Sequence, residues 1–164
     1  MSNIHPLRIL GIDPGYERLG LAVIERTENP RREKLLFSAC FKTLSSLPHA
    51  ERLNLLGTEV KKVIDEYSPT ALAIETLFFQ NNQKTAFKVA EARGAIIYQA
   101  KKKGLTVTEF TPLQIKTAIT SYGRSDKSQI KMMVKKLISI DKTIKYDDEY
   151  DAIAIGLTYF AYYR

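Results

Sequence analysis

Four acidic residues stand at positions where folding alone gives no reason for an acid. Asp13 and Glu75 each end a short run of apolar residues that is typical of a buried strand. A carboxylate at the end of a buried strand is costly unless a partner compensates its charge. Asp148 and Asp151 stand three residues apart in the first turn of a predicted helix, so both project from one face. Together, these acids predict a site that uses carboxylates.

The chemistry of such a site depends on whether the four acids meet. If the two strands are neighbours and the helix packs across their ends, the carboxylates converge, repel one another and tend to take up protons. A divalent cation removes that repulsion. A ligand set of oxygens, without Cys or His, selects a hard ion, magnesium or manganese, rather than zinc. Two such ions about 4 Å apart activate a water and stabilise the leaving oxygen in phosphodiester hydrolysis.

Each acid also has a simpler interpretation. Asp13 precedes a Pro-Gly pair and could be a turn aspartate. Asp148 could be an ordinary acid at a helix N-terminus. Glu75 is the hardest to explain in this way, because neither a turn nor a cap requires it. Asp147 and Glu149 are neighbouring acids that helical spacing places less squarely on the predicted catalytic face. The convergence of all four predicted acids therefore favours a site.

The charge is unevenly distributed along the chain. The formal net charge is +7, yet Lys84 to Lys145 holds 14 basic and 4 acidic residues, whereas the remainder holds 11 basic and 14 acidic. This separation indicates a face that binds a polyanion beside a carboxylate site. A solvated, lysine-rich helical surface is the alternative interpretation.

Other protein classes are disfavoured by composition. The single cysteine, Cys40, excludes an internal disulfide framework and a cluster of metal-bound thiolates. The apolar runs are strand-sized, far short of the roughly 20 residues that span a membrane. The first residues lack a basic segment followed by an apolar one, so no secretory signal is expected. We expect a cytoplasmic protein without a membrane partner.

The elements that must position the acids follow from periodicity and turn residues. Neither a repeat nor a linker divides the chain, so residues 1–164 are predicted to form one nuclease domain. The predicted strands are Arg8–Asp13, Gly20–Arg26, Lys34–Thr43, Ala71–Glu75 and Leu105–Phe110. The predicted helices are Ala50–Tyr67, Gln83–Lys102, one opening at Thr111-Pro112, Asp126–Ser139 and Asp148–Tyr162. This order predicts an α/β protein with a five-stranded mixed sheet flanked by helices, the order of the ribonuclease-H-like fold.

From about Arg8 to Tyr159 the chain resembles the RuvC family of crossover junction endodeoxyribonucleases. The similar segments are Gly11-Ile12-Asp13-Pro14-Gly15, Ala73-Ile74-Glu75 with Phe78, Ala92-Arg93-Gly94, Gln114-Ile115-Lys116, Asp126-Lys127-Ser128-Gln129-Ile130 and Asp148-Glu149-Tyr150-Asp151-Ala152-Ile153-Ala154. Each segment is weak alone, but their order and spacing together are specific. The resemblance implies a Holliday junction resolvase that nicks four-way DNA junctions symmetrically, with Mg²⁺, and leaves 5′-phosphate ends.

The resemblance also implies roles for individual residues. The four acids become the metal-binding catalytic residues, in agreement with the reasoning above. Phe78 would stack on an unpaired base, although a core phenylalanine or the adjacent Phe79 is an alternative. Lys116 and Lys127 would neutralise phosphate and stabilise the developing charge, against the alternative of ordinary surface lysines. Lys84, at the start of the basic segment, is expected to contact DNA.

Partners follow from the same resemblance. Two symmetric nicks require two active sites, which implies a homodimer with twofold symmetry. The helix Gln83–Lys102 is a plausible interface, although core burial explains its apolar residues equally well. The branch-migration proteins RuvA and RuvB are the further partners that the resemblance implies.

Three other functions remain possible on the sequence. A related ribonuclease-H-like nuclease of the pre-ribosomal-RNA processing type shares the strand-end aspartate and the glycine turn. An ATPase resembling acetate kinase or heat-shock proteins also begins this way, but it needs a longer chain with a second phosphate loop. The third is a module that binds branched DNA without cutting it, which the intact acids disfavour.

Overall fold

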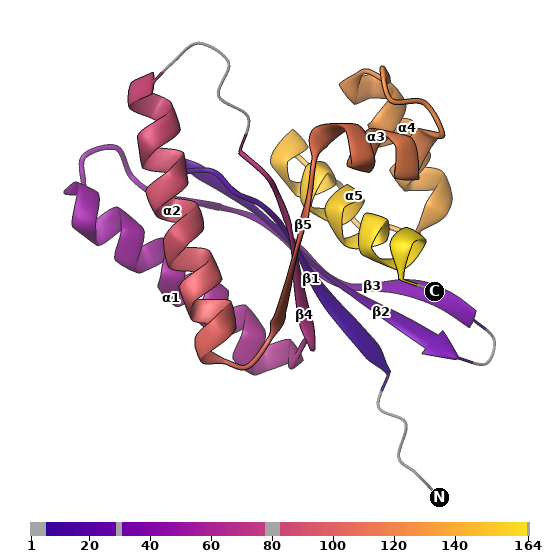
Figure 1. The fold of residues 1–164 in the computed structure, drawn as a ribbon, viewed down its shortest axis with the longest axis horizontal. Helices are drawn as coiled ribbons and strands as arrows, with labels where there is room; N and C mark the ends of the chain where they lie inside the picture. The colour runs from indigo at the N-terminus through magenta and orange to yellow at the C-terminus, as the bar shows by residue number, and fades with distance from the viewer. Residues whose placement is uncertain (1–5, 29–30, 78–82, 164) are drawn as a thin grey trace, which may run out of the picture.

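The computed structural model describes residues 6–28, 31–77 and 83–163, which form a sheet between two layers of helices (Figure 1). The strands are β1 (Leu7–Asp13), β2 (Arg18–Glu28), β3 (Arg31–Lys42), β4 (Ala71–Glu75) and β5 (Thr106–Phe110). The helices are α1 (His49–Tyr67), α2 (Gln83–Lys102), α3 (Pro112–Thr120), α4 (Lys127–Leu137) and α5 (Asp147–Tyr162). The predicted order of elements is confirmed.

The sheet has the strand order β3-β2-β1-β4-β5. Strands β1, β2 and β3 pair antiparallel because short turns connect them, whereas β4 and β5 continue the sheet parallel to β1. Helices α1 and α2 supply the crossover connections that parallel strands require. The five-stranded mixed sheet of an α/β protein is therefore confirmed.

Both faces of the sheet are covered. Helices α1 and α2 lie on one face, and α3, α4 and α5 lie on the other (Figure 1). Successive side chains of β1 enter opposite cores: Ile9 packs with the α5 layer, whereas Leu10 packs with the α1 and α2 layer. A strand buried on both sides must be apolar at every position, which explains the uninterrupted apolar runs before the two strand-end acids.

The β2–β3 hairpin is longer than predicted. Both strands extend beyond their apolar segments, and the buried Arg26 guanidinium pairs across them with Glu33 at 2.7 Å. This cross-strand ion pair lets polar residues continue the ladder where an apolar pattern no longer indicates a strand.

Two capped helix starts fix the segment that carries the predicted lysines. Thr111 caps α3 and Asp126 caps α4, and in each capping box the side chain accepts from the backbone N–H three residues later. The prediction that Thr111-Pro112 opens a helix is confirmed.

Within the described residues, none of the helices has the length and apolar character needed to cross a membrane.

Candidate active site

Asp13 and Glu75 end neighbouring strands. β1 and β4 run parallel with Ile12 in register with Ile74, so the two acids that follow lie side by side at one edge of the sheet. Arg93 of α2 donates a hydrogen bond to the backbone oxygen of Glu75 at 3.2 Å and also pairs with Glu109 of β5. The position of Glu75 is thus held by the helix layer behind it.

Helix α5 reaches this edge because two glycines let its backbone touch the sheet. A Cβ atom at Gly20 would lie 2.0 Å from the carbonyl oxygen of Asp148 and 3.1 Å from Cβ of Asp13. A Cβ atom at Gly11 would lie 2.3 Å from the carbonyl oxygen of Ala152. Real side chains do not tolerate such distances, so glycine at both positions is a condition for placing the first turn of α5 beside Asp13.

A cavity of about 440 Å³ opens at this edge of the sheet. Three of the four predicted acids and two of the three predicted lysines contribute to its wall, which is lined by Asp13, Glu75, Pro112, Ile115, Lys116, Ser125, Asp126, Lys127, Ile130, Asp151, Ala154 and Ile155. Asp148 is not among the lining residues. Its carboxylate instead pairs with Arg18 of β2 at 3.2 Å. The structure thus brings Asp13, Glu75 and Asp151 together and places Asp148 at the side of the group.

Burial and neighbouring carboxylates both favour the protonated form of Asp13. Loss of hydration on burial raises the pKa of Asp13 to about 8, and the carboxylates of Asp151, Glu75 and Asp148 contribute to the rise, against a lowering effect of Lys127. An aspartate in water titrates near 3.8. Asp13 is therefore largely protonated at neutral pH unless a cation joins the group.

The pKa values of Glu75 and Asp151 are raised as well. Burial and then the Asp151 charge raise the pKa of Glu75, while Lys127 and Lys116 oppose the shift. Burial also raises the pKa of Asp151, although its ion pair with Lys127 at 3.4 Å acts in the opposite direction. The two lysines thus compensate part of the negative charge.

Of the other predicted residues, the structure describes the side chains of Lys116 and Lys127 only. Lys116 is half-buried on α3, and Lys127 is exposed at the first position of α4, so the two approach the acids from neighbouring helices. Lys84 belongs to the first turn of α2, but its side chain lies outside the described part of the chain. Phe78 and Phe79 also lie outside the described residues.

Sequence reasoning missed two residues that hold α5. Arg18 pairs with Asp148, and Glu149 faces away from the cavity into the sheet. The buried Glu149 carboxylate accepts a hydrogen bond from Ser38 of β3 at 2.6 Å and pairs with Lys142 at 2.5 Å. Helical spacing places Glu149 on the core side of α5, and a buried carboxylate requires partners. This position was the signal that could have identified Glu149.

The chemistry of the donor set suits a hard divalent cation. The clustered side chains offer carboxylate oxygens, and burial together with neighbouring carboxylates raises the pKa values of Asp13, Glu75 and Asp151. Among the described residues, no three Asp, Glu, His or Cys side chains already stand as a complete metal-binding group. In this state Lys127 and Arg18 balance part of the charge of Asp151 and Asp148. The residues fit a divalent cation, which would neutralise these carboxylates in place of Lys127 and Arg18.

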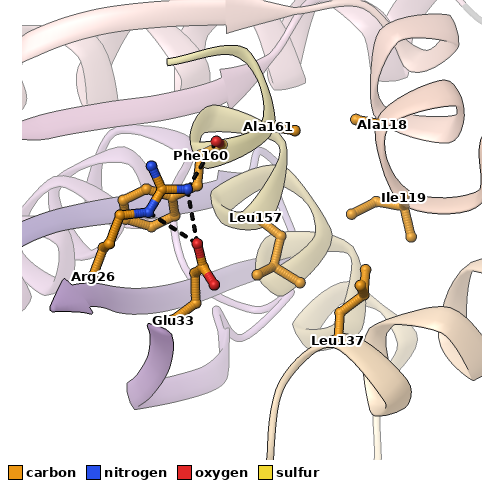
Figure 2. A pocket seen from close by; sticks show the side chains of 8 residues that line it. All are labelled: Arg26, Glu33, Ala118, Ile119, Leu137, Leu157, Phe160 and Ala161. Carbon is orange, nitrogen blue, oxygen red and sulfur yellow. Dashed lines mark hydrogen bonds and ion pairs between the residues drawn. The ribbon is translucent and has the colours of Figure 1, made fainter. Parts of the chain in front are cut away.

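A second cavity, of about 380 Å³, lies elsewhere on the molecule, lined by Arg26, Glu33, Ala118, Ile119, Leu137, Leu157, Phe160 and Ala161 (Figure 2). Its two charged side chains pair with each other, and Arg26 also donates to the backbone oxygen of Phe160 at 2.8 Å. Arg26 stacks on the ring of Phe160, with 4.3 Å between Cζ and the ring centroid. Because these groups already satisfy one another, this hollow offers no comparable chemistry.

Comparison with known families gives one consistent result. The family described as Crossover junction endodeoxyribonuclease RuvC matches residues 9–159. The protein of that name from Caldicellulosiruptor saccharolyticus is 44% identical over 151 residues, which cover 92% of this chain and 90% of that protein. The one from Thermosipho melanesiensis is 43% identical over 150 residues, which cover 92% of this chain and 94% of that protein.

Solved structures agree with this match. The structure of Thermus thermophilus RuvC superposes with a TM-score of 0.86 at 30% identity, covering 95% of both chains. The T. thermophilus RuvC in complex with Holliday junction substrate gives a TM-score of 0.84 at 29% identity, covering 95% of this chain and 94% of that one. The yeast mitochondrial resolvase Ydc2 shares the fold, with a TM-score of 0.71 at 13% identity, covering 98% of this chain and 82% of that one.

Proposed function

The chain belongs to the RuvC family of crossover junction endodeoxyribonucleases, and we propose that it is a Holliday junction resolvase that nicks four-way DNA junctions symmetrically in recombination and repair. The observation that carries the proposal is the cavity shared by Asp13, Glu75 and Asp151 with Lys116 and Lys127. Acids that need a cation and lysines that can neutralise phosphate are the two components of metal-dependent phosphodiester hydrolysis.

In this proposal Asp13, Glu75, Asp148 and Asp151 are the catalytic acids, and they would hold Mg²⁺, for which Mn²⁺ would substitute. When bound, the metal supplies an activated water and stabilises the leaving oxygen. Asp13 must give up its proton to serve as a ligand, because burial and its neighbours hold its pKa at about 8.

Lys116 and Lys127 neutralise the phosphate from the α3 and α4 side, and Lys127 can exchange its contact with Asp151 for one with the DNA. Phe78 and Lys84 are proposed as further DNA contacts. The whole chain, residues 1–164, is proposed to act as one nuclease domain.

The assay that tests this function compares three substrates. A synthetic four-way junction, a matched duplex and a structured RNA are incubated with the protein, with magnesium or with a chelator. We expect two symmetric nicks in the junction only, with 5′-phosphate ends, and no nicks in chelator. A nuclease that acts on RNA is the alternative; cutting of the RNA with the junction left whole would favour it and contradict our proposal.

The outer face of α2 supports a homodimer. Phe87 and Tyr98 are 68% and 63% exposed, and they share a helical stripe with Gly94. A Cβ atom at Gly94 would meet nothing within 4 Å, so this chain's own packing does not require glycine there. An exposed mid-helix glycine between two large apolar side chains suits close approach by a second copy. We propose α2 as the dimer interface.

Family membership supports two further proposals. RuvA and RuvB are the proposed partner proteins, and the cytoplasm is the proposed place of action.

Placing a charge on this stripe should separate the dimer. Tyr98→Glu is expected to convert the protein to a monomer, because the interface would bury a carboxylate without a partner. Sedimentation or light scattering measures the mass, with the comparably exposed Tyr122→Glu as a control that stays dimeric. A Tyr98→Glu protein with the mass of the wild type would contradict the α2 interface.

A further inference from the structure

A group of basic residues lies at the same edge of the sheet as the acids, on the side away from Lys116 and Lys127. Lys42, the last residue of β3, is in register with Arg18, the first residue of β2. Two residues further along β2, Gly20 is in register with Asp13. Because β3 is two strands from β1 and Lys42 lies two residues beyond the level of Asp13, Lys42 begins about 12 Å from Asp13.

Three cations lie near the ring of Tyr146, the residue that precedes α5. We call them the Tyr146 group: Lys42, Lys145 and Arg18. The Nζ atom of Lys42 lies 3.7 Å from the ring centroid and also donates a hydrogen bond to the Tyr146 hydroxyl. The Nζ atom of Lys145 lies 5.5 Å from the same centroid, and Cζ of Arg18 lies 5.9 Å from it. Attraction to the ring face offsets part of the repulsion between like charges and keeps the cations together.

The positive charge of this group is mostly unbalanced. Arg18 has a carboxylate partner in Asp148, but among the described residues neither Lys42 nor Lys145 forms an ion pair. Two other acids at the start of α5 are already engaged, Asp147 with Lys131 and Glu149 with Lys142. Both free lysines are exposed, so an anion from outside can reach them.

The proposed substrate is large enough to reach this group from the acids. The major groove of B-DNA alone is about 12 Å wide. A duplex arm is wider than this groove, so an arm seated at Asp13 extends over Lys42, which begins about 12 Å away. The acids would then lie between cations on both sides, with Lys116 and Lys127 on the α3 and α4 side and the Tyr146 group on the β3 side.

We propose that Lys42 and Lys145, held by Tyr146, form a second binding site for the phosphate backbone of junction DNA. This inference rests on the proposed function and deepens it. Two separated phosphate contacts would orient the strand across the acids, because a single contact leaves the DNA free to pivot. The site also explains why exposed lysines stay beside a carboxylate cluster without pairing with it.

The test is the salt dependence of junction binding by Lys42→Gln with Lys145→Gln, measured by fluorescence anisotropy in chelator from 50 to 200 mM salt. We expect affinity to fall at least about 10-fold and the slope of log affinity against log salt to become shallower by roughly 2, near 0.9 for each phosphate that is no longer neutralised. Lys42→Arg with Lys145→Arg should restore both values, since the charge is retained.

Lys61→Gln with Lys62→Gln is the matched control, because it removes the same charge from exposed positions on α1. If the Lys42 and Lys145 double variant shows the affinity and slope of this control while the wild type nicks junctions, the second phosphate site is wrong and the proposed function stands. A wild type that neither binds nor nicks junctions would overturn both.

Discussion

Asp13→Asn is expected to abolish junction nicking and also to stabilise the metal-free protein at pH 8. Loss of one carboxylate from the catalytic group should slow nicking at least about 1,000-fold, or roughly 4 kcal/mol of transition-state stabilisation. Junction binding should be retained, since the proposed phosphate contacts are lysines. The gain in stability has a separate cause, which is the burial of Asp13 among other carboxylates.

The sign of the stability effect follows from the two protonation equilibria. In the unfolded chain Asp13 loses its proton near pH 3.8, whereas in the folded metal-free protein it keeps the proton to about pH 8. Below pH 3.8 both states are protonated and the group costs nothing. Between these pH values the unfolded state binds fewer protons, so the free energy of unfolding falls as pH rises and levels off above about pH 8. Asparagine cannot ionise, so the free energy of unfolding of the Asp13→Asn variant does not fall for this reason.

Thermal unfolding in chelator at pH 5 and pH 8 measures the effect. The Tm of Asp13→Asn minus that of the wild type should grow by roughly 5–10 °C between the two pH values. Asp65→Asn is the control: hydrogen bonds from Lys103 and Lys61 lower the pKa of Asp65, so this carboxylate is ionised in both states at pH 5 and at pH 8. Its removal should lower the Tm by the same amount at both pH values. An Asp13→Asn difference that does not change with pH would show that the pKa of Asp13 is not raised in the folded protein.

Gly11→Ala is expected to destabilise the fold and to abolish nicking without touching a catalytic group. The added methyl would lie 2.3 Å from the carbonyl oxygen of Ala152 and 2.7 Å from the backbone nitrogen of Gly156. These are backbone atoms of α5, so no side chain can turn away to make room. Either the helix moves off the sheet or the strand is distorted, at a cost on the order of 3 kcal/mol.

Melting and nicking assays together test this expectation. The Tm should fall by roughly 6–12 °C, and nicking should be lost at temperatures where the variant is still folded, because α5 carries Asp148 and Asp151. Gly57→Ala is the matched control: its Cβ would meet the Gln99 side chain at an ordinary 3.5 Å, and alanine in a helix interior should add about 1 kcal/mol. A folded Gly11→Ala protein that nicks like the wild type would show that close packing of α5 is not required.

Most of the fold was predictable because its signals are local. Strands buried on both faces are apolar without interruption, helices repeat their apolar residues at helical spacing, and Thr111-Pro112 is a capping pair that needs no tertiary information. The ends of the β2–β3 hairpin were not predictable in this way. They consist of polar residues beyond the paired Arg26 and Glu33, and such residues carry no apolar pattern that marks a strand.

The sequence by itself identified Asp13, Glu75, Asp148 and Asp151 as candidate acids, because a carboxylate after an apolar run or on one face of a first helical turn is visible from neighbouring residues alone. Only the tertiary structure decided that Asp148 pairs with Arg18 at the side of the cavity, that Glu149 anchors α5 to β3, and that Lys42 lies beside Tyr146. These contacts join residues that are far apart along the chain, and they depend on strand register and on how closely α5 approaches Gly11 and Gly20. Register and close approach are set by the packing of whole elements, which the local pattern of side chains does not specify.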